Sequence, residues 1–324
     1  MKKLLSLLLV FTLMFTMVAC GQEDDGKDVS GDGGEKYKIG LVAKNQTDQF
    51  TAWQANEVIN LAEEEYFDKI KIEMIDGAGD NAKILSAMET FISKEVDAIL
   101  VQPNDTESLI PVINQAYDKG IIVITLSEKV DDEHSTSILS SEKGMGFLLG
   151  EKAAEVLPED AKVVLLEGQP GLSVVVDRTD GIKEGLTSSG REDIEILVIQ
   201  NADWARDKAM NYMEDWLTLY DQIDGVIAHD DIMLLGAVSA IENAGRKDEF
   251  SFLGGIDGLP EGCEAVKEGR TTCSVAQDAP EQAKAALSMA ISTLEGGKQE
   301  DVVIDTELIT LENVDKWLEL HDEQ

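Results

Sequence analysis

From residue 37 onward, short apolar segments alternate with longer amphipathic ones, and this alternation restricts the possible folds more than any other feature of the chain. The apolar segments, for example 98–101 and 225–228, are continuous and have the length of buried strands. The segments between them carry apolar residues at helical spacing. Strands that alternate with helices form parallel sheets with helices on both faces. The alternation runs in two successive series, so we predict an α/β protein with two doubly wound lobes.

One predicted strand ends in a carboxylate. The stretch 252–262 has the pattern of a buried strand that ends at Asp257, turns at Gly258 and begins a helix at Pro260. Ligands of open α/β sheets bind outside the carboxyl ends of the strands, which makes Asp257 a candidate ligand contact. A carboxylate at this position can also satisfy the first backbone N–H groups of the helix. This stretch alone leaves both roles open.

The first twenty residues are typical of an export signal. An apolar run over residues 4–19 follows two lysines and is short for a membrane span. It ends in small residues directly before Cys20, a pattern that resembles the lipobox of bacterial lipoproteins, whose cysteine is acylated. We therefore predict a signal peptide over 1–19 and a lipid on Cys20 that anchors the protein to a membrane. An ordinary cleaved signal followed by a chance cysteine is the alternative.

The chain is strongly acidic. Its formal net charge is −37, and removal of the predicted signal peptide with its two lysines makes it −39. Such a surface argues against nucleic acid or anionic lipid as a partner. Residues 20–36 combine glycine with like charges and are expected to form a flexible acidic linker.

No segment carries the signature of a catalytic, metal or cofactor site. Cys263 and Cys273 either pair or remain free buried thiols, and neither has neighbours that suggest a metal site or a nucleophile. The three histidines likewise lack visible partners of this kind. Glycines in segment 144–150 open a helix, but their spacing and the lack of a later strand-end acid favour close helix packing over dinucleotide binding. We therefore predict a protein that is not an enzyme and has no metal or cofactor.

Several segments together resemble the periplasmic sugar-binding proteins of the ribose and galactose/glucose type. The resemblance covers about residues 37–317 and depends on the order and spacing of segments 47–50, 80–83, 103–105, 175–181, 201–204, 228–233, 255–258 and 275–278. It implies two lobes that are joined by three crossing strands and trap a sugar in the cleft as they close. By the same resemblance, the N-terminal lobe comprises residues 37–138 plus 279–305, and the C-terminal lobe comprises 139–278 plus 306–324.

The resemblance also implies ligand contacts from both lobes. The matching positions are the carboxylates Asp48, Asp230 and Asp257, the amide Gln277, the guanidinium of Arg178 and the rings of Phe50 and Trp204. These residue types suit a sugar, because its hydroxyls both donate and accept hydrogen bonds and its C–H faces pack on flat apolar groups. Core packing is the alternative for the two rings, and the polar loops beside them favour ligand contact.

Some positions depart from that family. Ser127 and Glu128 stand where it usually has Asp-Arg or Asn-Lys after the fourth strand, and we include both in the predicted site. Lys44 replaces a small polar residue, and Leu172 and Val174 replace polar contacts. The calcium loop of the glucose/galactose type has no counterpart. These departures favour a pentose, a deoxy-sugar or a cyclic polyol such as inositol. The resemblance as a whole favours a hexose such as galactose or glucose, with ribose, inositol or another polyol as the alternative. The acidic candidates also allow a cationic ligand.

Together these features predict a substrate-binding lipoprotein that captures a monosaccharide and delivers it to the membrane permease of an ABC importer. A sensory receptor that presents its closed lobes to a chemoreceptor or kinase is the alternative with the same fold. An export signal where a DNA-binding domain would stand argues against a transcriptional regulator. We expect a monomer that is anchored outside the cytoplasm and does not bind nucleic acid.

Overall fold

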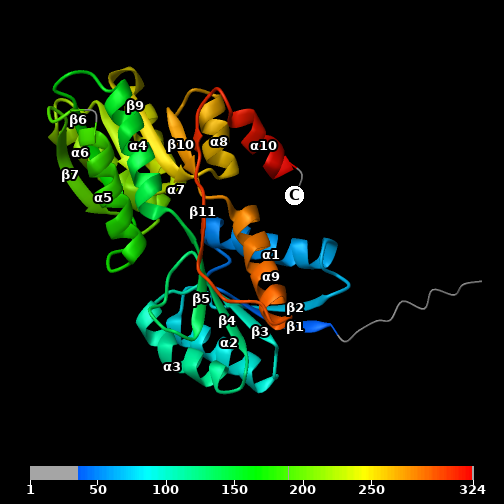
Figure 1. Ribbon diagram of the computed structural model, residues 1–324. Coiled ribbons are helices and arrows are strands. Elements are labelled where there is room, and N and C mark those ends of the chain that lie inside the picture. Colours follow the sequence, from blue (N-terminus) through cyan, green and yellow to red (C-terminus); the bar gives the residue numbers. More distant parts are fainter. Residues whose placement is uncertain (1–35, 189, 323–324) are drawn as a thin grey trace, which may run out of the picture. The chain divides into compact units, whose positions relative to one another are not determined.

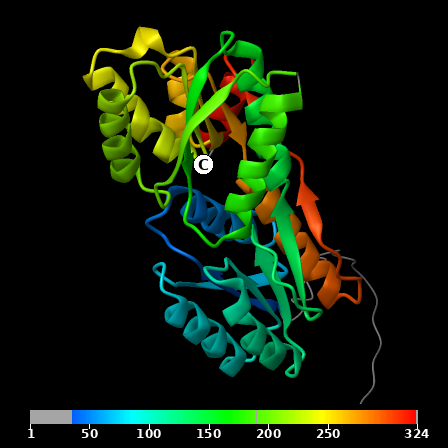
Figure 2. The same cartoon turned by 90° about the vertical axis from the view of Figure 1, so that its left-hand side faces the viewer.

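The computed structural model describes residues 36–188 and 190–322. The predicted signal peptide, Cys20 and nearly all of the acidic linker lie outside these residues. The described chain forms two six-stranded, mostly parallel sheets with helices on both faces (Figures 1 and 2), as the alternating pattern predicts. No helix in this part of the chain has the length and apolar composition needed to cross a membrane.

The first sheet has the strand order β11-β5-β4-β3-β1-β2, and every pair in it is parallel. Leu41 of β1 pairs with Leu100 of β3, and both are fully buried. Parallel neighbours need a crossover connection, which helices supply for β1, β2, β3 and β4, whereas residues 127–134 join β4 to β5 without a helix. The strands are β1 (Tyr37–Ala43), β2 (Ile70–Asp76), β3 (Ala98–Val101), β4 (Ile122–Leu126), β5 (Ser135–Ser140) and β11 (Val302–Ile304).

Four helices cover the first sheet. Helices α1 (Gln49–Glu64) and α9 (Ala279–Leu294) pack on one face, and α2 (Asn81–Ser93) and α3 (Thr106–Tyr117) pack on the other. All four helices begin after an aspartate whose side chain accepts a hydrogen bond from a backbone N–H of the first turn. Such caps fix where a helix begins. The capping residues are Asp48, Asp80, Asp105 and Asp278.

The second sheet has the order β12-β10-β9-β8-β6-β7, and only the pair β10–β12 is antiparallel among the described strands. Its central strands are fully buried, which explains their continuous apolar sequences. The strands are β6 (Lys162–Glu167), β7 (Glu195–Asn201), β8 (Gly225–Ala228), β9 (Phe252–Asp257), β10 (Cys273–Ala276) and β12 (Leu308–Ile309).

Helices also enclose the second sheet. Helices α4 (Glu142–Val156) and α5 (Ser173–Ser188) pack on one face, whereas α6 (Arg206–Leu219) and α7 (Asp231–Asn243) pack on the other. Helices α8 (Pro260–Lys267) and α10 (Val314–Asp322) form a smaller cluster near β10 and β12. A single 3₁₀ turn, η1 (Lys247–Glu249), precedes β9.

The chain passes between the two sheets three times, from β5 to α4, from β10 to α9 and from β11 to β12. The sequence places the start of the second lobe at residue 139, whereas β5 pairs within the first sheet as far as Ser140. Strand β11 is absent from the sequence prediction. It has only three residues, and the central one, Val303, is 57% exposed, so it carries no buried-strand pattern.

Helices α4 and α5 cross with their backbones in contact. A Cβ atom on Gly146 would lie 2.2 Å from the carbonyl oxygen of Arg178, and one on Gly150 would lie 2.3 Å from that of Ile182. The α5 glycines Gly181 and Gly185 make equally close approaches to the backbone of α4. Only glycine permits such distances. The packing explanation is therefore confirmed for Gly146 and Gly150, whereas a Cβ atom on Gly144 would meet the side chain of Ser141.

The two cysteines of the second lobe are free and buried. Burial raises the pKa of the Cys263 thiol to about 12 and raises that of Cys273 as well, so both remain protonated at neutral pH. The sequence leaves open a disulfide or two free thiols, and the structure contains the free thiols.

Candidate functional site

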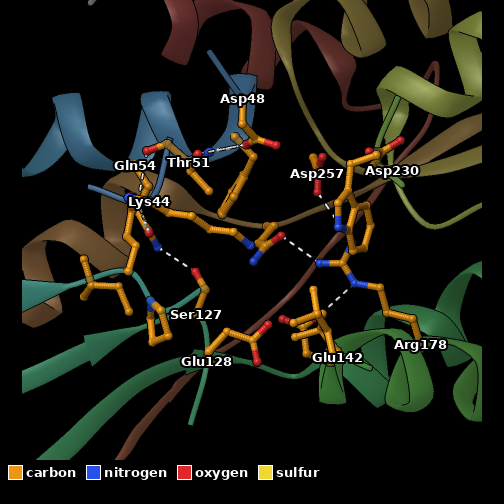
Figure 3. Close-up of a pocket in the computed structure, with 18 residues that line it drawn as sticks. Lys44, Asp48, Thr51, Gln54, Ser127, Glu128, Glu142, Arg178, Asp230 and Asp257 are labelled. Atoms are coloured by element: carbon orange, nitrogen blue, oxygen red, sulfur yellow. Dashed lines mark hydrogen bonds and ion pairs between the residues drawn. The ribbon is translucent and has the colours of Figure 1, made fainter. Parts of the chain in front are cut away.

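A pocket lies at the carboxyl ends of strands from both sheets. Its walls come from the segments that follow β1, β3, β4 and β5 in the first sheet and β6, β7, β8, β9 and β10 in the second. This is where open α/β sheets bind ligands. All nine predicted contact residues line it: Asp48, Phe50, Ser127, Glu128, Arg178, Trp204, Asp230, Asp257 and Gln277 (Figure 3).

The first sheet contributes the start of α1 and the turn after β4. Asp48 caps α1 by accepting a hydrogen bond from Thr51 N at 2.9 Å, and Phe50 lies one residue inside the helix. Ser127 has a φ of +65°, a left-handed conformation that turns the chain directly after β4. Its neighbour Glu128 is only 6% exposed and accepts a hydrogen bond from Ser173 Oγ at 3.1 Å. Ser173 is the first residue of α5, so this hydrogen bond spans the two lobes.

Buried amides support the first-sheet wall. Gln54 Nε2 donates to Ser127 Oγ at 2.9 Å, and Gln102 Nε2 donates to Gln54 Oε1 at 2.7 Å. Gln282 Nε2 donates to Ser140 Oγ, at the end of β5, over 2.9 Å. Because each amide is fully or almost fully buried, these hydrogen bonds hold the side chains in single positions.

Arg178 organises the second-sheet wall. Its Nε donates to Glu142 Oε2 at 2.6 Å, and its Nη2 donates to Gln277 Oε1 at 2.9 Å. Its Nη1 donates to the carbonyl oxygen of His229 and lies 3.8 Å from Asp257 Oδ1. All five donors of a guanidinium lie in one plane, so these partners fix the orientation of the group against the pocket (Figure 3).

The strand-end carboxylates differ in their partners. Asp230 caps α7 by accepting a hydrogen bond from Met233 N at 2.6 Å. Asp257 has a φ of +117°, and its side chain accepts no hydrogen bond from the described residues. The helix that follows Asp257 begins after Leu259, whose N–H donates instead to Asp231 Oδ2 at 3.1 Å. Asp257 therefore does not have the helix-cap role that the sequence left open, and α8 has no side-chain cap.

Trp204 supplies a partly exposed ring beside these charges. The ring lies 5.7 Å from Arg178 Cζ, which is cation–π distance. It also covers Gly168, where a Cβ atom would lie 2.0 Å from Trp204 Cζ2. Trp204 itself has a φ of +60°. A positive φ in a tryptophan is uncommon and costs conformational energy, and here it orients the ring at the pocket.

The site is electrostatically unusual because several carboxylates share a buried volume. Burial raises the pKa values of Glu128, Glu142 and Asp257, and it raises that of Asp230 to about 7. Burial, with a further contribution from the charge of Arg178, lowers the pKa of His229 to about 3, so this imidazole is neutral. No cluster of three or more potential metal ligands exists in the described parts of the chain.

Some lining residues escaped the sequence-based prediction. Glu142, Gln54 and Gln102 line the pocket, but none stands in a motif that the resemblance covers. Gln54 follows Phe50 by four residues and therefore lies on the same face of α1, a spacing that could have identified it. Lys44, Leu172 and Val174, noted only as departures from the family, also line the pocket.

Comparison with known proteins establishes the class to which this fold and pocket belong. The sequence of residues 39–299 matches the protein family described as periplasmic binding protein domain, and the chain therefore belongs to the periplasmic binding protein family. Members of this family are substrate-binding components of transporters, so the chain is a binding protein and not an enzyme.

Particular relatives are similar over most of their length. A putative rhizopine-binding protein of Rhizobium meliloti is 31% identical over 76% of this chain and 82% of that protein. The ribose import binding protein of Bacillus subtilis is 28% identical over 94% of this chain and 97% of that protein. A solved ABC transporter solute-binding protein of Bacillus halodurans with bound myo-inositol is 31% identical, with a TM-score of 0.81 over 90% of this chain and 99% of that one.

Proposed function

We propose that the chain is an extracytoplasmic substrate-binding lipoprotein that captures a monosaccharide or a cyclic polyol and delivers it to the permease of an ABC importer. The observation that carries this proposal is the composition of the pocket. It combines the Trp204 ring with the hydrogen-bonding groups of Arg178, Asp257 and Gln277 within one set of strand ends. A polyhydroxylated ring needs both kinds of partner.

The relatives support this ligand class without selecting one member of it. Their names refer to ribose and rhizopine, and the solved relative holds myo-inositol. We propose a hexose such as galactose or glucose as the first ligand to test, with ribose and myo-inositol beside it.

We propose that the nine residues predicted from the sequence contact the ligand. We also propose that ligand binding closes the two lobes on one another, the N-terminal lobe being residues 37–138 plus 279–305 and the C-terminal lobe residues 139–278 plus 306–324. Hinge closure buries a ligand between two lobes and creates the surface that a permease recognises. Small-angle scattering should show a smaller radius of gyration with ligand than without it. An unchanged radius at saturation would contradict closure.

A thermal-shift screen tests the ligand class directly. A ligand at one hundred times its dissociation constant adds about 2.7 kcal/mol to the free energy of unfolding. We expect at least one pentose, hexose or cyclic polyol to raise the melting temperature, and Arg178→Ala to lose most of that response. If no compound of the panel raises the melting temperature and calorimetry confirms that none of them binds, the proposed function is wrong.

We also propose that a lipid on Cys20 anchors the mature protein to the membrane. Cys20→Ser should release the protein or block its maturation. Normal processing and retention of this variant in the membrane fraction would contradict the anchor.

A further inference from the structure

We propose that the ligand carries a protonated amino group, which binds between the carboxylates of Glu128 and Glu142. This inference rests on the proposed function, since it selects amino sugars and amino polyols within that ligand class. It places the ammonium where the two lobes meet, because Glu128 follows β4 of the first sheet and Glu142 begins α4 beside the second.

The pocket contains more buried acid than base. Five carboxylates line it, whereas Lys44 and Arg178 are the only cationic side chains among the described lining residues. The lining carboxylates are Asp48, Glu128, Glu142, Asp230 and Asp257. A neutral ligand would leave this imbalance in place, and uncompensated charge in a buried site is costly.

Three of the five carboxylates have partners or positions that account for them. Asp48 and Asp230 cap helices α1 and α7, where the helix dipole favours a negative charge. Asp257 lies 3.8 Å from Arg178 Nη1. Arg178 also forms a shorter ion pair with Glu142, at 2.6 Å between Nε and Oε2, so this one cation serves two carboxylates, and Glu128 forms no ion pair with a described side chain.

Both glutamates present a carboxylate oxygen that lacks a protein donor. Glu142 uses Oε2 for Arg178, and its Oε1 is buried without any hydrogen-bond partner among the described residues. Glu128 uses Oε2 for the Ser173 hydroxyl, and no described group donates to its Oε1. The two side chains are 8% and 6% exposed, respectively, and Figure 3 shows their carboxylates directed toward one another.

An ammonium group matches this arrangement. It supplies three donors and one positive charge in a compact volume, so it can bridge two carboxylate oxygens and offset their repulsion. Burial and this repulsion raise the pKa of Glu128, against the opposing effects of the Lys44 charge, the Ser173 hydrogen bond and the Arg178 charge. A metal ion fits less well, because the described residues provide no group of three or more metal-ligating side chains.

The competing explanation is that the two glutamates bind a neutral polyol as protonated carboxylic acids. The two explanations make opposite predictions about protons. An ammonium favours the ionised glutamates, so its binding releases protons to solvent below neutral pH. Donation from a carboxylic acid to a hydroxyl favours the protonated form and releases none.

Titration calorimetry with matched ligand pairs tests the proposal. The pairs are D-glucose with D-glucosamine, D-galactose with D-galactosamine, and myo-inositol with an amino-deoxy-inositol. We expect at least one amino compound to bind ten times or more as tightly as its neutral parent. At pH 6, in two buffers of different ionisation enthalpy, its binding should release protons.

Two variants locate the effect. Glu128→Gln should reduce the preference for the amino compound to below threefold, because the amide keeps the shape and loses the charge. The matched control is Glu167→Gln, a carboxylate at the end of β6 whose two oxygens already accept hydrogen bonds from Thr179 and Asn201 and which does not line the pocket. This control should keep the preference unchanged.

The outcomes separate the inference from the function on which it rests. Neutral parents that bind as tightly as their amino partners, without proton release, would overturn the inference and leave the proposed function standing. A preference for amino compounds that survives Glu128→Gln would overturn the placement. Absence of binding by all six compounds and by the wider sugar panel would overturn the proposed function itself.

Discussion

Asp257 Oδ1 lies 3.8 Å from Arg178 Nη1, and the Asp257 carboxylate accepts no hydrogen bond from the described chain. The two side chains lie on different elements of the second lobe, one at the end of β9 and the other in α5. Arg178 is held by Glu142, Gln277 and the His229 carbonyl, so it does not depend on Asp257 for its position. The carboxylate of Asp257 therefore remains available to ligand hydroxyls.

Asp257→Ala should weaken ligand binding by about 1.5 to 3 kcal/mol, roughly ten- to a hundredfold or more, because a charge-assisted hydrogen bond is lost. The melting temperature without ligand should not fall, because this carboxylate neither caps a helix nor supports the core. Calorimetric titration and thermal unfolding of the same preparation measure both effects. A large loss of stability with unchanged affinity would show that the role of Asp257 is structural.

Trp204→Phe should remove most of the ligand-induced change in tryptophan fluorescence even where binding survives. The Trp204 ring is partly exposed at the pocket, so a ligand that covers it changes its environment. The matched control is Trp216→Phe, which removes a buried tryptophan from the core between α6, α7 and the sheet. A ligand response that persists in Trp204→Phe and disappears in the control would contradict the predicted contact.

Asp230→Asn should stabilise the ligand-free protein at alkaline pH. Burial raises the pKa of Asp230 from 3.8 to about 7. Because the folded-state pKa is the higher one, the contribution of Asp230 to stability is fully present below about pH 4 and is lost as the pH rises to about 7. Asparagine keeps the cap and removes the charge, so we expect a gain of about 1 to 3 kcal/mol at pH 8, a few degrees in melting temperature.

The gain from Asp230→Asn should shrink at pH 5, where the native carboxyl is mostly protonated. The matched control is Asp80→Asn, which replaces an exposed cap of α2 that accepts hydrogen bonds from Ala82 N and Lys83 N. Thermal unfolding at pH 5 and pH 8 should show little change for this control. An equal effect of Asp230→Asn at both pH values would show that its charge is not the cause.

Gly146→Ala should destabilise the protein by about 1 to 3 kcal/mol, because the added methyl group would meet the Arg178 carbonyl at 2.2 Å and force α4 away from α5. It should also weaken ligand binding, since Glu142 and Arg178 lie on these two helices. Glu151→Ala, on the exposed face of α4, is the control and should change neither property. Denaturant unfolding and ligand titration distinguish this result from a purely local effect, which would leave affinity unchanged.

The order of strands and helices could be predicted from the sequence because buried strands and amphipathic helices have different apolar spacing. The aspartates Asp80 and Asp278 cap α2 and α9 and thereby determine where these helices begin. Strand β11 could not be predicted. Its three residues form an edge strand, and pairing with β5 rather than burial determines its structure.

The residues of the site also fall into two groups, those that could be predicted from the sequence and those that could not. Residues directly after a strand, such as Asp230 and Asp257, could be predicted because strand ends converge at one edge of a parallel sheet. Glu142 could not, because nothing in the local sequence distinguishes it from a solvent-exposed glutamate at a helix start. Its role depends on the crossing of α4 and α5, which brings it to Arg178, 36 residues later in the chain.

The backbone contact between α4 and α5 has a consequence for redesign of the ligand range. The four glycines at the crossing have no side chains that could repack around a larger residue. The two helices therefore hold Glu142 and Arg178 in a fixed relative position, and substitutions at the crossing would disturb it. Leu172 and Val174, next to the start of α5, line the pocket and lie outside this crossing, whereas Ser127 has a positive φ and a hydrogen bond from Gln54 that restrict its replacement. Libraries that aim to change the bound ligand should therefore vary Leu172 and Val174 and leave Ser127 and the glycine crossing intact.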